Sequence, residues 1–209
     1  MNIIFDFDGT LFDTRTVDIT AFNRALHHMG RKELSADVIL ASIGKPIGLI
    51  AKDYLGTDDD DLIKRFVTLA LEFELEEIKT SAKMFPHAIE LLQSLKATGH
   101  NLAICSNGTK DYVISILKKF GILSMFDIVW HKHDRICNKS ALSIVIDRMP
   151  NEKSIFIGDR KEDWQAAKAN GITFIGAGYG FGGDELAGVR YIASELPQIF
   201  GLVAQIHNQ

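Results

Sequence analysis

The sequence places acidic and polar residues where they could act together on a phosphate group. They are Asp6, Asp8, Ser106, Asn107, Lys139, Asp159 and Asp163. Carboxylates that gather in one place repel one another, by about 4 kcal/mol for two unit charges 4 Å apart at an effective dielectric constant near 20. A cation must offset that repulsion. Asp6, Asp8 and Asp159 offer hard oxygen ligands suited to Mg²⁺, which also binds phosphate oxygens, and Lys139 would supply further positive charge.

Most of these residues follow short apolar runs that are typical of buried strands. Because β-branched and aromatic side chains pack on both faces of a parallel sheet, we expect strands at 2–5, 101–105, 127–130, 154–157 and 172–175. Helical spacing fills the intervening stretches 88–98, 111–120, 140–148 and 162–170. This alternation predicts an α/β fold with a Rossmann-like, mostly parallel sheet and helices on both faces. Ligands bind beyond the carboxyl ends of such strands, so the polar residues would share one crevice.

Residues 15–80 form a region of different character. They contain no convincing strand, and apolar residues recur three and four apart with charges between them in the stretches 17–29, 35–42 and 60–78. We therefore expect an all-helical insertion of residues 15–80 in an α/β core that comprises residues 1–14 and 81–209.

Composition limits the partners of this chain. A net charge of -4 over 209 residues gives no electrostatic attraction to nucleic acid or to anionic lipid, so we expect a small phosphorylated metabolite as the partner. No basic leader precedes Asp6 and no apolar stretch approaches the length of a bilayer span. We therefore expect a cytoplasmic protein, in which Cys105 and Cys137 remain thiols.

Four short motifs carry a family resemblance. Residues 6–11, Asp-Phe-Asp-Gly-Thr-Leu, resemble the first signature of the haloacid dehalogenase-like phosphatases. Ser106-Asn107, Lys139 and the segment from Gly158-Asp159 to Asp163 resemble the other three, in the family's order and over essentially the whole chain. The helical segment 15–80 is similar to the cap that this family inserts after its first strand. Two positions depart from the pattern: Ser140 stands where proline is frequent, and Arg160 stands where serine or threonine is frequent.

The resemblance implies a covalent mechanism. Asp6 would attack phosphorus and form an aspartyl-phosphate, which divides one difficult displacement into two easier ones. Asp8 would protonate the leaving alkoxide and then deprotonate the attacking water, and its backbone carbonyl would bind Mg²⁺. Asp159 would be a metal ligand, and Asp163 would hold a metal-bound water or Lys139.

The same resemblance assigns residues to the phosphate group. Gly9 would allow a sharp turn that brings backbone N–H groups toward the phosphate, with the Thr10 hydroxyl beside it. Ser106 and Asn107 would orient the phosphoryl oxygens. Lys139 and Mg²⁺ would stabilise the charge that develops on those oxygens.

Structural explanations also exist for several of these residues. Asp8-Gly9 is a common turn pair, and the segment 106–108 could cap the helix that begins near Lys110. Lys139 could be a solvated lysine, with Lys132 as the true partner of the site. Asp163 could serve only to favour its helix N-terminus.

Two further segments suggest other ligands. Glycines at 176, 178, 180, 182 and 183 are reminiscent of a dinucleotide-binding loop, but they follow a late strand, so we expect a mobile loop at the rim of the site. The run 131–134, His-Lys-His-Asp, could bind a metal, yet adjacent side chains at a strand end point in opposite directions. A solvated loop is the simpler interpretation.

Together these features predict a magnesium-dependent phosphatase of a small phosphomonoester, similar to the phosphoglycolate phosphatase-like members of the family. Substrate choice would depend on the turn 43–46, where Lys45 could contact a second anionic group of the substrate. A phosphomutase on the same core is the alternative within this chemistry. A non-catalytic, receiver-like phosphate-binding module is the alternative from another class.

Overall fold

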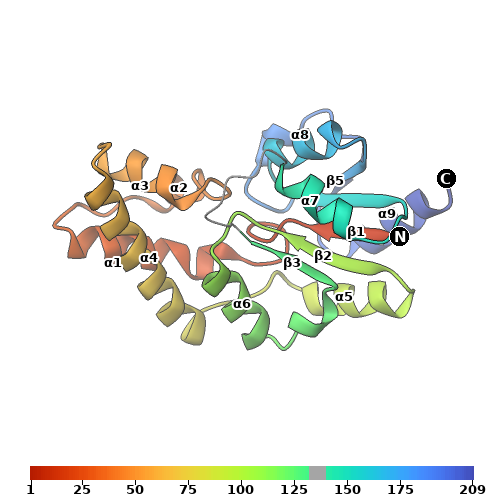
Figure 1. Ribbon diagram of the computed structural model, residues 1–209, viewed down its shortest axis with the longest axis horizontal. Coiled ribbons are helices and arrows are strands. Elements are labelled where there is room, and N and C mark those ends of the chain that lie inside the picture. The colour runs from red at the N-terminus through yellow and green to blue at the C-terminus, as the bar shows by residue number, and fades with distance from the viewer. Residues whose placement is uncertain (132–139) are drawn as a thin grey trace.

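The computed structural model describes residues 1–131 and 140–209, which form a parallel sheet with helices around it (Figure 1). The strands are β1 (Asn2–Phe5), β2 (Asn101–Cys105), β3 (Ile128–Trp130), β4 (Ser154–Gly158), β5 (Thr173–Ala177) and β6 (Ile192–Ala193). They lie in the order β3-β2-β1-β4-β5-β6, and every pairing is parallel. The chain thus builds outward from β1 first to one side and then to the other. The carboxyl ends of β1 and β4 flank that switch point, where ligands bind in such sheets.

Helices cover both faces of this sheet, as the strand–helix alternation predicted. Successive strand residues point to opposite faces, so Ile3 and Phe5 pack with one group of helices and Ile4 with another. The first group is α5 (Ala88–Ala97), α6 (Lys110–Lys119) and α9 (Gln198–His207). The second group is α7 (Ala141–Arg148) and α8 (Lys161–Ala169). Both faces of β1 are therefore fully buried.

The remaining helices gather at one end of the molecule, to the left of the sheet in Figure 1. They are α1 (Asp18–His28), α2 (Ala36–Leu40), α3 (Ile47–Leu55) and α4 (Asp60–Thr80). Their apolar side chains form a hydrophobic cluster of their own, in which Phe22 and Phe66 are buried. Helix α4 also packs against α6 of the core. Short 3₁₀ helices at Thr14–Thr16, Leu123–Met125 and Gly183–Leu186 complete the chain.

Three elements were not expected from the sequence. Helix α3 follows Pro46 and ends at Gly56 in a left-handed conformation, which are ordinary start and stop signals. Helix α9 carries Ile199, Val203 and Ile206 on its buried face. Strand β6 has two residues, too few to leave a pattern. Among the helices that the structure describes, none has the length and apolar character that crossing a membrane requires.

Candidate active site

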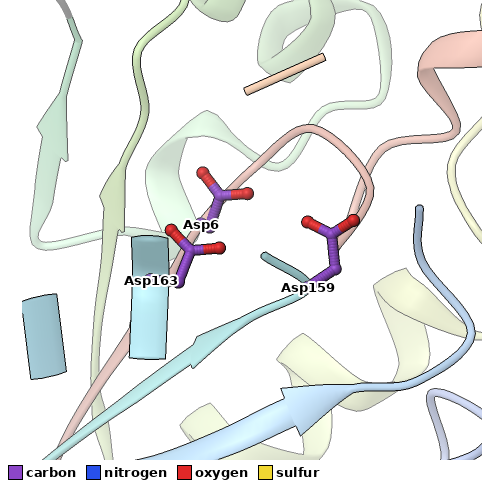
Figure 2. A group of neighbouring side chains, drawn as sticks. All are labelled: Asp6, Asp159 and Asp163. Atoms are coloured by element: carbon purple, nitrogen blue, oxygen red, sulfur yellow. The ribbon is translucent and has the colours of Figure 1, made fainter. Parts of the chain in front are cut away.

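Three carboxylates meet at the carboxyl edge of the sheet. Asp6 follows β1, Asp159 follows β4, and Asp163 lies in the first turn of α8. One carboxylate oxygen from each lies within 4.8 Å of the others, and Figure 2 shows the three side chains around a shared space. Parallel pairing of Phe5 with Ile157 brings the ends of the two strands together. The sequence placed Asp6 and Asp159 at strand ends and Asp163 one helical turn later, and it predicted a shared crevice for them.

Their electrostatic interaction is unfavourable without a cation. Burial raises the pKa of Asp6 well above its ordinary value, and the charges of Asp163, Asp159 and Asp8 raise it further. Burial raises the pKa of Asp163 to about 7, and the Asp159 charge contributes to that rise. Burial likewise raises the pKa of Asp159 to about 6, although a hydrogen bond from Phe181 opposes it. The three groups therefore favour either protonation or a bound cation.

Asp159 shows that this group fits a metal ion. Its Oδ2 accepts a hydrogen bond from the backbone N–H of Phe181 at 2.6 Å. Its Oδ1 is buried, and no hydrogen-bond partner for it occurs among residues 1–131 and 140–209. A buried carboxylate oxygen without a partner is costly, whereas hard oxygens of this kind are preferred ligands of Mg²⁺. Asp6, Asp159 and Asp163 could therefore hold that ion.

Asp163 also has a structural role. Its Oδ2 accepts a hydrogen bond from the backbone N–H of Arg160 at 3.0 Å, at the N-terminus of α8. No other side-chain hydrogen bond of Asp163 occurs in the described part of the chain, so its second carboxylate oxygen can face the site. The helix-capping and site interpretations of Asp163 are therefore compatible.

Asp8 turns its carboxyl group away from the other three. Thr14 Oγ1 and Tyr112 Oη both donate hydrogen bonds to Asp8 Oδ1, at 2.9 and 2.8 Å. Burial raises the pKa of Asp8 to about 6, while these two hydrogen bonds lower it. The group of three that could hold a metal does not include this carboxyl. Since every side chain that bonds to Asp8 here uses Oδ1, Oδ2 is left for a proton.

The glycines around Asp159 are required by close packing. Gly9 has φ of 82°, and a Cβ atom there would lie closer than 3.0 Å to the Asp159 carboxyl group. A Cβ atom at Gly180 or Gly182 would approach Asp159 equally closely. The glycine-rich segment therefore packs directly against this residue, which the sequence interpretation as a rim loop did not include. Its position directly after β5, beside β4, was the available signal.

The remaining predicted phosphate contacts lie around the same crevice. Thr10 is buried, and its Oγ1 has no hydrogen-bond partner in the described part of the chain. Ser106 is buried, and its Oγ accepts a hydrogen bond from the N–H of Gly108 at 2.9 Å. Thr109, rather than Ser106 or Asn107, caps α6. Asn107 instead donates from Nδ2 to the carbonyl of Gly44 at 2.9 Å, which connects the core to the α2–α3 turn.

The turn 43–46 lines two cavities at this site. A cavity of about 290 Å³ includes Asp6, Asp163 and Arg160 in its wall. A second cavity, of about 50 Å³, lies on the side of Asp8. Lys45 lines both, but its Nζ pairs with Asp53 at 3.2 Å and its side chain is half exposed.

Several residues identified in the sequence lie outside the residues that the structure describes. Lys139, Lys132 and Cys137 fall within 132–139, as do His133 and Asp134, so the predicted role of Lys139 stays a prediction. Cys105 is buried as a free thiol. Burial and the charges of Asp6 and Asp163 raise its pKa. It therefore stays protonated beside the site.

Three further polar residues near the site were not identified from the sequence. Asp18, Glu74 and Tyr112 are buried and line the smaller cavity together with Asp8. Asp18 lies in the first turn of α1, Glu74 in the middle of α4 and Tyr112 in α6. Because these three residues lie on helices far apart in the sequence, no local motif indicates that they meet.

Comparison with known proteins agrees with this arrangement. A phosphoglycolate phosphatase of Nitrosospira multiformis is 29% identical over 195 residues, which cover 86% of this chain and 83% of that protein. A phosphoglycolate phosphatase of Neisseria meningitidis is 24% identical over 216 residues, which cover 95% and 91%. The crystal structure of a predicted phosphatase from Clostridium acetobutylicum shares the fold, with a TM-score of 0.84, 22% identity and coverage of 98% of both chains. Residues 3–177 match the family haloacid dehalogenase-like hydrolase, and this chain belongs to that family.

Proposed function

We propose that this chain is a magnesium-dependent phosphatase that hydrolyses a small phosphomonoester through an aspartyl-phosphate on Asp6. One observation carries the proposal: Asp6, Asp159 and Asp163 converge within 4.8 Å, while the Asp8 carboxyl faces a separate cavity. This arrangement separates a nucleophile beside a cation site from an acid on the leaving-group side. The phosphoglycolate phosphatases among the relatives support the same reaction class.

The two aspartates at the end of β1 divide the chemistry. Asp6 is the nucleophile, and its carboxylate forms a bond to phosphorus as the ester oxygen leaves. Asp8 donates a proton from Oδ2 to that oxygen, because Thr14 and Tyr112 hold Oδ1. In the second step Asp8 removes a proton from the water that hydrolyses the aspartyl-phosphate.

The charged phosphoryl group requires stabilisation from several sides. Asp6, Asp159 and Asp163, with the backbone carbonyl of Asp8, would hold Mg²⁺, which would supply positive charge to the phosphoryl oxygens. Lys139 adds to that charge. The residues that contact the phosphate are Gly9, Thr10, Ser106 and Asn107.

The helices α1–α4 act as a cap over this site. We keep the division proposed from the sequence, with the cap at 15–80 and the core at 1–14 and 81–209. Hydrogen bonds connect the α2–α3 turn of the cap to the core beside the site: Asn107 donates to Gly44, and Arg160 Nη2 donates to the carbonyl of Leu40 at 2.7 Å. A covered site excludes bulk water from the reacting groups.

Phosphate release tests the proposal. We would assay a panel of small phosphomonoesters with and without Mg²⁺, using the wild type, Asp6→Asn and the control Asp111→Asn, which changes an exposed aspartate of α6. We expect turnover that requires Mg²⁺ and Asp6 but not Asp111. Undiminished turnover by Asp6→Asn would refute the nucleophile. Trapping of phosphate on the wild type and not on Asp6→Asn would identify the intermediate.

A further inference from the structure

The cavity beside Asp8 is the place for the leaving group. Asp8 protonates the ester oxygen in the proposed reaction, so the rest of the alcohol must extend from Asp8 away from Asp6. The cavity of about 50 Å³ begins at Asp8 and is closed by α1, α4 and the turn 43–46. This volume corresponds to roughly three to five water positions. A leaving group of two or three carbons with one polar end fits that space.

Two buried acids of the cap line this cavity. Asp18 is 5% exposed and Glu74 is 4% exposed. Tyr112 lines the same cavity. Burial raises the pKa of its hydroxyl, and the charges of Asp18, Asp8 and Glu74 raise it further. Its single proton goes to Asp8 at 2.8 Å, and Asp18 Oδ1 lies further away, at 3.4 Å. Among the described residues, the Asp18 carboxyl therefore has only this one long hydrogen bond.

Glu74 has no compensating partner among the residues that the structure describes. Within residues 1–131 and 140–209, no hydrogen bond and no ion pair reaches its carboxyl group, although the side chain is buried and lines the cavity. Lys45 is the cation in the described wall of the cavity, and its Nζ pairs with Asp53 on the exposed side. The metal group does not include Asp18 or Glu74. Buried carboxylates are ordinarily paired or hydrogen-bonded, whereas the described part of the chain supplies no cation to Asp18 and Glu74.

We propose that Asp18 and Glu74 bind a primary ammonium group on the leaving alcohol, which makes the substrate a short phosphorylated amino alcohol. This inference rests on the proposed function, because it assigns the substrate class of the same site. An ammonium group offers three N–H donors, and the cavity wall provides two carboxyl groups and the Tyr112 hydroxyl oxygen as acceptors. A leaving group with a carboxylate would instead bring a further negative charge against Asp18 and Glu74. Phosphoglycolate, after which the relatives are named, is therefore a poor substrate of this chain.

The first experiment requires no variant. We would measure kcat/KM of the wild type with Mg²⁺ for 2-aminoethyl phosphate and for propyl phosphate, which carries a methyl group in place of the ammonium. Phosphoglycolate and glycerol 3-phosphate would complete the set. We expect 2-aminoethyl phosphate to exceed both propyl phosphate and phosphoglycolate at least 100-fold. Equal values, or a preference for phosphoglycolate or glycerol 3-phosphate, would overturn the inference.

The second experiment assigns the preference to the two acids. Asp18→Asn and Glu74→Gln keep side-chain size and remove charge, and each should lower the ratio of kcat/KM between 2-aminoethyl and propyl phosphate at least tenfold. Glu72→Gln, which changes an exposed glutamate of the same helix, should leave that ratio unchanged. An unchanged ratio in Asp18→Asn and Glu74→Gln would overturn the assignment. Turnover of any ester without an ammonium preference would overturn this inference alone, whereas no turnover of any ester by the wild type would overturn the proposed function as well.

Discussion

Glu74→Gln should stabilise the free protein, because Glu74 is a buried acid that has no partner within 1–131 and 140–209. Burial raises the pKa of its carboxyl well above the ordinary value of 4.5, and the Asp8 charge adds to that rise. The folded state therefore binds a proton more tightly than the unfolded state at this position. The free energy of unfolding consequently decreases as the pH rises above about 4.5. Glutamine has nearly the same shape and carries no charge at any pH.

Protonation limits the size of this effect. At pH 7 the folded protein can avoid a buried charge by taking up a proton, which costs about 1.4 kcal/mol for each pH unit above the unfolded pKa. With an ordinary value of 4.5, the penalty at pH 7 cannot exceed about 3.4 kcal/mol. For a chain of this length, each 1 kcal/mol shifts Tm by about 2–4 °C. Glu74→Gln should therefore raise Tm by several degrees and by no more than about 14 °C.

Thermal unfolding of the two proteins without Mg²⁺ or substrate would measure the gain. We expect a difference in Tm at pH 7 that shrinks as the pH falls toward 4.5, where the unfolded carboxyl is also protonated. Glu72→Gln, on the exposed face of α4, provides the baseline and should shift Tm little at either pH. A lower Tm for Glu74→Gln at pH 7 would refute the reasoning, because it would show that the charged carboxyl has a stabilising partner.

Three other substitutions test separate parts of the site. Gly182→Ala should lower Tm and weaken Mg²⁺ binding, measured by calorimetry, at least tenfold, because its Cβ would lie closer than 3.0 Å to the Asp159 carbonyl. The control is Gly201→Ala in α9, where nothing lies within 4 Å of the added Cβ, and it should stabilise the fold by about 1 kcal/mol. Equal behaviour of the two variants would contradict this account. Tyr112→Phe removes a hydrogen bond that lowers the pKa of Asp8, and the pKa of Asp8 should therefore rise further above about 6. The alkaline limb of the pH profile of kcat/KM should then move to higher pH. A limb that does not move would exclude Asp8 as the titrating acid. Contact of Lys45 with a second anionic group is the sequence-based alternative to a cationic leaving group. It requires Lys45→Ala to lower kcat/KM for phosphoglycolate at least tenfold and to leave propyl phosphate unaffected. A nearly neutral effect would remove Lys45 from substrate binding.

The sheet and its helices were predictable because their signals are local. The run 2–5 is apolar at every position, and β1 is buried on both faces accordingly. The predicted helix 60–78 agrees with α4 at its start and within two residues of its end, since Asp59 provides the N-terminal cap. Strand β6 has two residues and depends on neighbours distant in sequence, whereas Pro46 and Gly56 do mark the ends of α3. Helix α9 did carry an apolar stripe that the sequence analysis overlooked.

The site was predictable where it lies at strand ends. Asp6 and Asp159 meet because β1 and β4 are neighbours in a parallel sheet, which the strand–helix alternation implies. Glu74 could not be found in this way. Its helix pattern identifies Phe66 and Phe73 as buried, but it does not show that α6 lies across from Glu74 or that Asp8 faces it.

The placement of the buried acids divides the site into two electrostatic parts with different requirements. Asp6, Asp159 and Asp163 form a group that a divalent cation can neutralise. Asp18 and Glu74 lie on the far side of Asp8, where they cannot share that ion. Two buried acids that no described cation neutralises lower the stability of the free protein, and a cationic ligand that binds the folded form would restore it. Their retention in the cap is therefore best explained by recognition of a cationic leaving group and not by the chemistry at phosphorus, which the other carboxylates already provide.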